Sequence, residues 1–317
     1  MKRNIADVLR RGVASTLANW PVIVTRIVET AVLFGVMIIA VIGAVVPPLV
    51  SAGIKEWTLP AGNNPAEVVL RILGEHAALF AYLFVFLCAI ALAILAIHSV
   101  VTAGATRIYV DADRAAPDAP ELRREQFAVF TMERWSAGAR AWWLRIFWIY
   151  NGAWGFSSLV FLLPLLIVMA LLAMAINAES TAGLIAASCG GLALLALVAI
   201  PLGIVTAMWA QKAVVICVAR DTGAREALRS GWRETRADFL RHFVVFFLIA
   251  IVSAGASAVA STLFAPLSFP MRPDGGFSSL LFGPMHIVSM AAQSAISSAV
   301  GLWMIAAFAA MTEGKAS

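Results

Sequence analysis

The sequence predicts an all-α fold, a polytopic integral membrane bundle of six transmembrane helices. Hydrophobic residues make up 62% of the 317 residues and charged residues 13%, and the mean hydropathy is +0.90. A soluble domain of this length could not bury so much apolar surface, so lipid must cover part of it. Six apolar stretches each exceed the ~20 residues that a helix needs to cross the hydrocarbon core. They run over residues 22–48, 77–106, 142–176, 183–218, 239–267 and 285–311.

The distribution of positive charge predicts the topology. Of the 23 Lys and Arg residues, only Lys55, Arg71 and Arg272 fall on the connections of one side. Basic residues collect on the cytoplasmic side of membrane proteins, so both chain ends are expected in the cytoplasm. The sequence pI of about 9.5 then reflects topology and contact with anionic lipid headgroups. Nucleic-acid binding is not expected, because the Arg residues are spread over several juxtamembrane segments.

The chain is expected to form one domain, residues 1–317, that repeats a single plan three times. Each unit reads as a basic amphipathic segment, an apolar span, an outer connection, a second span and an acidic mark. Repeated units of this kind are common in membrane proteins. The acidic marks lie at Asp113, Asp221 and Glu313, which gives helix-pair units of about 1–113, 121–221 and 222–317.

The amphipathic segments predict three interfacial helices on the cytoplasmic side. Residues 9–20 and 228–239 share Leu, Arg, Gly, Thr and Ala at one constant spacing, and residues 135–145 match them in character. A helix with an aromatic face and a separate stripe of Arg residues lies in the interface, with its rings in lipid and its cations on phosphates. In the third copy the aromatic face consists of Leu228, Trp232, Thr235 and Phe239.

Two interpretations of these helices remain open. They anchor the bundle and set its topology, or they bind anionic lipid headgroups or a partner membrane protein. The candidate binding residues are the basic and aromatic side chains of the first and third copies, namely Arg10, Arg11, Arg225, Arg229, Trp232, Arg233 and Arg236.

Polar groups inside the spans are the remaining candidates for chemistry. Arg26 and Glu29 lie three residues apart, so one helix face can hold them as an ion pair. Charges inside spans are functional candidates by default, although this pair lies near the interface, which favours a structural role. His98 has no acidic neighbour on its own helix face, so no metal site is expected there. A hydrogen bond to a neighbouring helix is the favoured interpretation of this histidine.

Three further positions complete this set. If the acidic marks define the register, His98, Thr206 and Ser298 fall at matching depths in the three units, as in a polar ring around an approximate three-fold axis. Lys212 lies near the end of the fourth span, where its ammonium is expected to reach the interface.

A motif before the fifth span connects the chain to a known family. The run 227–239, which follows a span that ends at Asp221, contains Ala-Leu, a small residue, Trp and Thr-Arg. It resembles the bacterial six-helix membrane proteins related to the membrane domain of glycerophosphodiester phosphodiesterases, most closely over residues 205–250. Here Gly231 is added between the small residue and Trp232. The resemblance implies a bundle in the bacterial inner membrane, and it carries over no hydrolase residues because the phosphodiesterase domain is absent.

These patterns favour a non-enzymatic inner-membrane protein that interacts with lipids or with a partner protein through its cytoplasmic helices. The sequence has no Gly-rich phosphate loop, no zinc-binding His-Glu-x-x-His helix and no nucleophile elbow, and no cofactor is expected. A transporter of a small solute or lipid is the alternative. Pro164 and Pro201 are expected to bend the third and fourth spans, which would line a path together with His98, Thr206 and Ser298. An intramembrane enzyme is a third hypothesis, which requires several polar groups to converge in one pocket.

Overall fold

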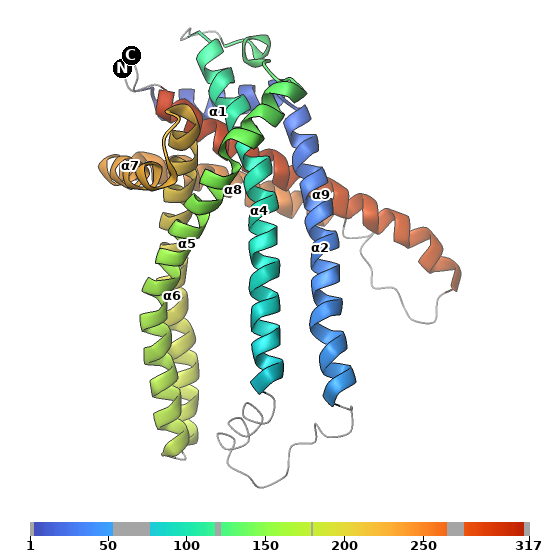
Figure 1. Cartoon of the computed structure of the whole chain (residues 1–317), viewed down its shortest axis with the longest axis vertical. Helices are drawn as coiled ribbons and strands as arrows, with labels where there is room; N and C mark the ends of the chain where they lie inside the picture. The colour runs from blue at the N-terminus through green and yellow to red at the C-terminus, as the bar shows by residue number, and fades with distance from the viewer. Residues whose placement is uncertain (1–2, 53–76, 118–121, 179, 265–275, 314–317) are drawn as a thin grey trace. The chain divides into compact units, whose positions relative to one another are not determined.

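A computed structural model of the chain describes residues 3–52, 77–117, 122–178, 180–264 and 276–313, with the side chains of 45–52, 80, 264, 276–291 and 313 left aside. The regular structure in these ranges is entirely helical (Figure 1). The long helices are α2 (Pro21–Ala52), α4 (Ala77–Ala115), α5 (Met132–Asn177), α6 (Thr181–Ala219), α8 (Phe239–Phe264) and α9 (Gly276–Glu313). The short ones are α1 (Ile5–Ala18), the 3-10 turn η1 (Arg124–Phe127) and α7 (Ala224–Ala237).

The six long helices confirm the predicted membrane spans. Each contains a stretch that is long and apolar enough to cross a membrane. Their apolar side chains point outward in large number, for example Leu159, Leu197 and Leu240, which are each at least 70% exposed. Such surface is stable only in lipid, so the protein is an integral membrane protein.

The middle amphipathic segment differs from the expectation of a separate interfacial helix. Helix α5 begins at Met132 and continues through residues 135–145 into the third span without interruption. The physical reason lies in the helix ends: α1 stops at Asn19 and α7 stops at Asp238, residues that favour caps and turns. Asn19 and Asp238 each lie seven residues after the glycine of their segment. The corresponding residue of the middle segment is Arg145, a good helix former, so the helix continues there.

The contacts divide the chain into two compact units, residues 26–98 and residues 1–25 with 99–317. In the smaller unit, α2 and α4 approach closely where Gly43 faces the ring of Phe86. Tyr82 Oη donates a hydrogen bond of 3.2 Å to the carbonyl of Gly43 at the same place. The missing side chain of Gly43 therefore allows two spans to approach, as small residues commonly do between membrane helices.

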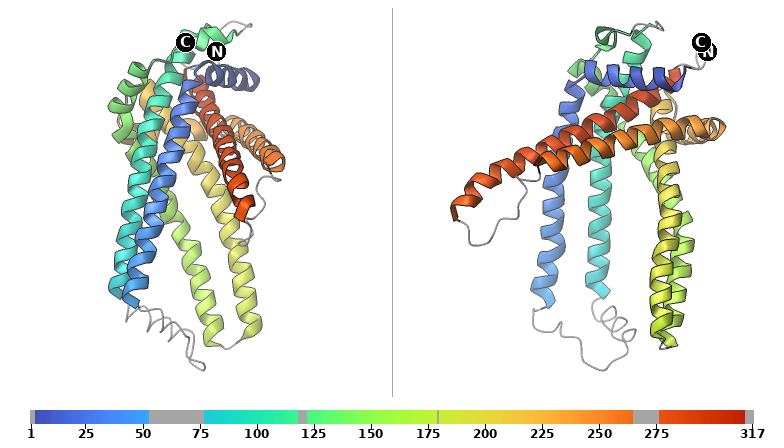
Figure 2. Two further views of the ribbon diagram at one scale, coloured as in Figure 1. Left: turned by 90° about the vertical axis from the view of Figure 1, so that its right-hand side faces the viewer. Right: turned by 180° about the vertical axis from the view of Figure 1, so that it is seen from behind.

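In the larger unit, the long helices pair and the short helices lie across one end. Helices α5 and α6 form an antiparallel hairpin, α8 runs beside α9, and α1 packs along α9 (Figure 2). Helix α7 packs on α6 at the end of the α5–α6 hairpin where the short helices lie. The fully buried core of this end includes Tyr109, Ile146, Ile216 and Phe308.

Three glycines mark the places where an amphipathic segment meets a span. A Cβ on Gly12 of α1 would lie 2.8 Å from Trp303 of α9, and one on Gly138 of α5 would lie 2.6 Å from Arg107 of α4. A Cβ on Gly231 of α7 would lie 3.0 Å from Ala213 of α6. Each segment therefore needs glycine at its closest approach to the span on which it packs.

Candidate functional site

Helices α1 and α7 have equal lengths, and their bounds are offset by the same number of residues as the two similar sequence segments. Helix α1 covers Ile5–Ala18 and α7 covers Ala224–Ala237, each 14 residues long and 219 positions apart. Asn19 ends α1 and fixes the following turn, because its side chain donates to Ser15 O and Phe127 O and accepts from two backbone N–H groups. The buried amide thus has all its groups in use, which fixes how α1 enters the bundle.

A tryptophan from a span holds each short helix through the same backbone group. Trp209 Nε1 of α6 donates a hydrogen bond of 2.8 Å to the carbonyl of Leu228 in α7. Trp303 Nε1 of α9 donates one of 3.2 Å to the carbonyl of Leu9 in α1, the residue at the same relative position. Trp is suited to this role because its ring is apolar while its N–H requires an acceptor.

The orientation of α7 corrects part of the predicted face. Its buried side consists of Ala227, Gly231 and Thr235, which pack against the bundle. Thr235 is 1% exposed, so it does not belong to the lipid-facing surface on which the sequence placed it. Trp232 is 43% exposed and Phe239 is 44% exposed, in agreement with an aromatic face toward lipid.

The Arg stripe of α7 points away from the bundle. All of its members are exposed, and in the described part of the chain they form no ion pair with an acidic residue; they are Arg225, Arg229, Arg233 and Arg236. Other arginines of this end pair internally. Arg11 is one of them: it is 3% exposed, and its Nε lies 2.8 Å from Asp113 Oδ1.

The burial of Arg11 corrects its assignment to the lipid-binding set. Its guanidinium also donates to the carbonyls of Asp113, Ala116 and Pro117, so each of its three nitrogens has an acceptor within the fold. Arg3 Nη1 joins the same carboxylate at 2.7 Å. This cluster links α1 to the end of α4. Arg10, the residue before Arg11 on α1, is exposed.

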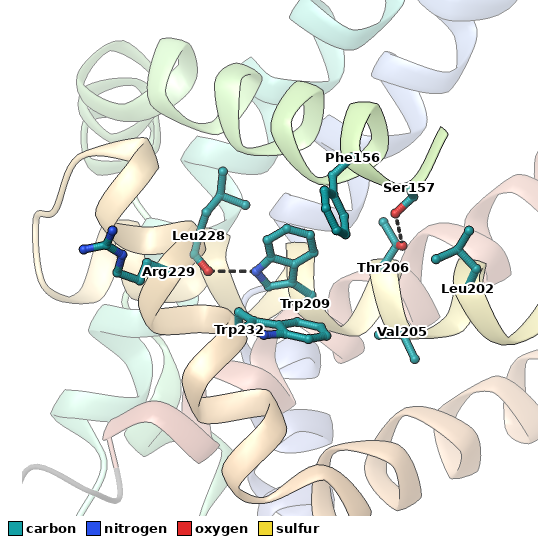
Figure 3. Close-up of a pocket in the computed structure, with 9 residues that line it drawn as sticks. All are labelled: Phe156, Ser157, Leu202, Val205, Thr206, Trp209, Leu228, Arg229 and Trp232. Carbon is teal, nitrogen blue, oxygen red and sulfur yellow. Dashed lines mark hydrogen bonds between the residues drawn. The ribbon is translucent and has the colours of Figure 1, made fainter. Parts of the chain in front are cut away.

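An apolar groove lies between α5, α6 and α7, beside the Arg stripe (Figure 3). Its volume is about 310 Å³. Trp209 forms its wall, with ring centroids 6.0 Å from Phe156 and 5.4 Å from Trp232 in edge-to-face arrangements. The full lining is Phe156, Ser157, Leu202, Val205, Thr206, Trp209, Leu228, Arg229 and Trp232.

The two ends of the groove differ in chemistry. Leu228 and Arg229 lie at one end, with the guanidinium directed away from the rings, and Leu202 lies at the other with Ser157 and Thr206 (Figure 3). The hydroxyls of Ser157 and Thr206 form a buried hydrogen bond with each other. Because this pair is satisfied internally, it presents little polarity to an apolar ligand.

Lys212 does not reach the interface as the sequence predicted. Its side chain is fully buried, and Nζ donates a hydrogen bond of 2.7 Å to Thr312 Oγ1 of α9. Glu234 Oε2 of α7 lies 3.3 Å from the same ammonium, and Glu234 Oε1 lies 2.7 Å from Arg220. A carboxylate from the next helix lies beside the buried ammonium. The lysine therefore joins α6, α7 and α9 instead of extending to water.

The smaller unit contains a second polar cluster. Arg26 and Glu29 form the expected ion pair, with Nη1 2.7 Å from Oε2. His98 Nδ1 of α4 lies 2.9 Å from Glu29 Oε1, so the histidine has an acidic neighbour, which lies on another helix. The expected hydrogen bond to a neighbouring helix is confirmed. Three of the four charged or titratable candidates of the spans therefore meet at Glu29, which is 4% exposed.

Other predicted residues lie in separate surroundings. Thr206 bonds to Ser157 across α5 and α6, and Ser298 is buried in α9. The ring of His98 with these two residues stays a prediction, since His98 belongs to the other unit. Among the described residues, no group of three His, Cys, Asp or Glu is placed to hold a metal ion.

One exposed carboxylate at this end has a perturbed pKa. Hydrogen bonds from Trp142 Nε1 and Arg145 Nη1, at 3.0 and 2.8 Å, hold the pKa of Asp221 below its ordinary value. Asp221 also has φ of 50°, a conformation that a short polar side chain tolerates better than most. The acidic mark thus closes the turn between α6 and α7 and links it to α5.

Comparison with protein-family models, curated proteins and solved structures found no match. The groove residues Phe156, Val205 and Trp209 did not stand out in the sequence. A tryptophan near the end of an apolar span was the one available signal, because Trp is enriched at membrane interfaces. Which rings it would meet depends on the packing of α7.

Proposed function

We propose that this protein is a non-enzymatic membrane protein that binds anionic phospholipid headgroups through α7. One observation carries the proposal. The arginines of α7 are exposed and form no internal ion pair in the described chain, whereas Arg3, Arg11 and Arg26 are paired within the fold. Each basic residue near an anionic surface contributes about 1 kcal/mol to its attraction. The four cations of α7 therefore supply about 4 kcal/mol.

The proposal places this end of the molecule at the cytoplasmic face of a bacterial inner membrane. The charge bias of the sequence supports that orientation. The family resemblance, to membrane domains of glycerophosphodiester phosphodiesterases, is compatible with a lipid-related role. In a variant whose Cys88, Cys189 and Cys217 are replaced with Ala, a Cys introduced at Ser230 of α7 should resist impermeant thiol reagents applied to intact cells. Labelling from outside would remove both the orientation and the lipid proposal.

The proposal also treats α1, the first turns of α5 and α7 as three copies of one segment. Their glycines support this, because Gly12, Gly138 and Gly231 each lie where the segment meets a span of another of the three predicted repeats. The three segments would then form one basic layer, of which α7 carries the lipid-binding surface.

Lipid analysis of the purified protein tests the headgroup proposal. Replacing Arg225, Arg229, Arg233 and Arg236 with Gln should lower the fraction of anionic lipid that remains bound after mild-detergent extraction. A control variant removes the same charge from exposed arginines outside α7, namely Arg123, Arg124, Arg134 and Arg140. Equal retention in the α7 variant and the wild type, or equal loss in both variants, would contradict a site on α7.

Transport of a small solute or lipid is the second candidate. The observation that favours it is the cluster of Arg26, Glu29 and His98, since titratable groups that bond one another inside spans are typical of ion-coupled transport. Solute flux in proteoliposomes tests it. Flux that persists unchanged in a Glu29→Gln variant, or no flux at all, would argue against this function.

A further inference from the structure

We propose that the groove between α5, α6 and α7 holds one acyl chain of an anionic phospholipid whose headgroup lies at Arg229. This inference rests on the proposed function and adds to it a ligand class and a defined site. The lining of the groove supports it. Six of its nine residues are aromatic or aliphatic, and Arg229 lies at one end. The hydroxyls of Ser157 and Thr206 bond each other.

The dimensions of the groove fit one chain. The α6 side of the groove runs from Leu202 to Trp209, which are seven positions apart, or about 10 Å along the helix at ~1.5 Å per residue. Half of a ~30 Å hydrocarbon core is about 15 Å, so the groove covers most of the depth of one leaflet. Its volume of about 310 Å³ lies at the small end of the range of ligand pockets, about 300–1,000 Å³, which suits a single chain better than a whole phospholipid.

The polarity of the groove fits the orientation of such a lipid. Arg229 and Leu228 lie at the end nearest the Arg stripe, and Leu202 lies at the end farther along the span (Figure 3). A phosphate at Arg229 would gain a charge-assisted contact while its chain extended toward Leu202. Headgroup and chain thus follow the direction that lipids take in a membrane.

The rigidity of the walls distinguishes this groove from general lipid contact. The indole of Trp209 is fixed by its hydrogen bond to the Leu228 carbonyl and by edge contacts with Phe156 and Trp232. A preformed groove costs little ordering when the ligand enters. The exposed outer face of α6, for example Leu197 at 72% exposure, offers no such enclosure.

Photo-labelling with a lipid probe tests the proposal. The protein is reconstituted in phosphatidylcholine vesicles that contain a phosphatidylglycerol with a diazirine in one acyl chain. Labelled peptides are identified by mass spectrometry. Label should concentrate on the groove residues of α6 and α7, and excess lysophosphatidylglycerol should reduce it several-fold, whereas glycerol phosphate should not. Equal labelling of the Leu197 face and the groove would overturn the proposal.

Two matched variants sharpen the test. Val205→Phe fills the groove and should reduce groove labelling several-fold, while Leu197→Phe adds the same ring outside the groove and should leave it unchanged. If Val205→Phe does not fold, the competition experiment in the wild-type protein still decides. Unchanged labelling in a folded Val205→Phe protein would overturn the site.

The headgroup is tested with a second probe. A phosphatidylcholine with the same diazirine chain should label the groove several-fold less than phosphatidylglycerol, and Arg229→Gln should remove this difference. Equal labelling by both probes in the wild type would overturn the anionic ligand. If the four-arginine variant loses anionic lipid while Val205→Phe labels normally, the groove proposal is wrong and the proposed function of α7 stands.

Discussion

Replacing Glu234 with Gln should destabilise the packing of α7 on α6, because the change removes the negative charge that lies 3.3 Å from the buried ammonium of Lys212. Removing one partner of a buried ion pair costs about 3–5 kcal/mol. Here the cost is reduced, since Lys212 keeps its hydrogen bond to Thr312 and Glu234 is 13% exposed. The pair of Glu234 with Arg220, whose side chain is 40% exposed, adds at most about 1 kcal/mol.

The expected loss is therefore about 2–3 kcal/mol, a factor of roughly 30 to 150 in the unfolding equilibrium. It is measured by reversible unfolding of the purified protein in mixed micelles, with tryptophan fluorescence as the signal. Glu226→Gln is the matched control, because this carboxylate of α7 is exposed and should change stability by less than about 0.5 kcal/mol.

A double-mutant cycle identifies the cause. Lys212→Met removes the buried charge and leaves Glu234 beside Arg220, so combining it with Glu234→Gln should recover most of the lost stability. The reasoning would be refuted if the double variant were as unstable as Glu234→Gln alone. It would also be refuted if Glu234→Gln cost no more than the Glu226 control.

Three further predictions follow from the same end of the molecule and from the smaller unit. Gly12→Leu should cost about 1–3 kcal/mol in the same unfolding assay, because a Cβ there would meet Trp303, whereas Gly35→Leu should cost clearly less because nothing lies within 4 Å of a Cβ at that position. Glu29→Gln should lower the stability of the smaller unit, seen as faster proteolysis of the 26–98 segment; protection equal to the wild type would show that the cluster is not structural. The pKa of Asp221 is lowered by its hydrogen bonds, so these bonds are kept at neutral pH and lost as the pH falls through that lowered value, below the ordinary ~3.9. The indole N–H resonance of Trp142 should follow this titration, and Asp221→Asn should abolish it.

The spans were predictable because their signal is local. A run of more than ~20 apolar residues is sufficient to specify a membrane helix, whatever lies around it. The expected stretch at residues 183–218, for example, falls inside α6, and the one at 285–311 falls inside α9. The spacing of 219 residues between the two similar segments likewise relates the bounds of α1 and α7. The pair of Arg26 with Glu29 was also local, since both lie on one helix.

The partners of buried polar groups were not predictable, because they come from distant parts of the chain. Glu29 and His98 are 69 positions apart, and Lys212 and Thr312 are 100 positions apart. The sequence showed which positions of the spans were polar, but it could not show which helix would face each of them. Snorkelling of Lys212 was a reasonable prediction for an isolated helix and failed because Glu234 of α7 provides a charge within the bundle.

The difference between α1 and α7 explains why the lipid site is proposed on only one of two similar helices. At α1, the indole of Trp303 lies directly against Gly12, and Arg11 forms a buried ion pair with Asp113. At α7, Gly231 meets the small Ala213 instead, so Trp209 is free to form the groove wall with Trp232. The position that corresponds to Arg11 is Ser230, so α7 needs no buried guanidinium to hold it.

These exchanges distinguish the helix that anchors the bundle from the helix that we propose binds lipid. Glu234 and Trp209 hold α7 on the bundle. In the described contacts, the four arginines of α7 take no part in this attachment. Cations kept on an exposed helix face beside an apolar groove repel one another, at a cost of a few tenths of a kcal/mol per neighbouring pair. Anionic headgroups at the same surface would turn that repulsion into attraction, and this is the physical basis for assigning lipid binding to α7.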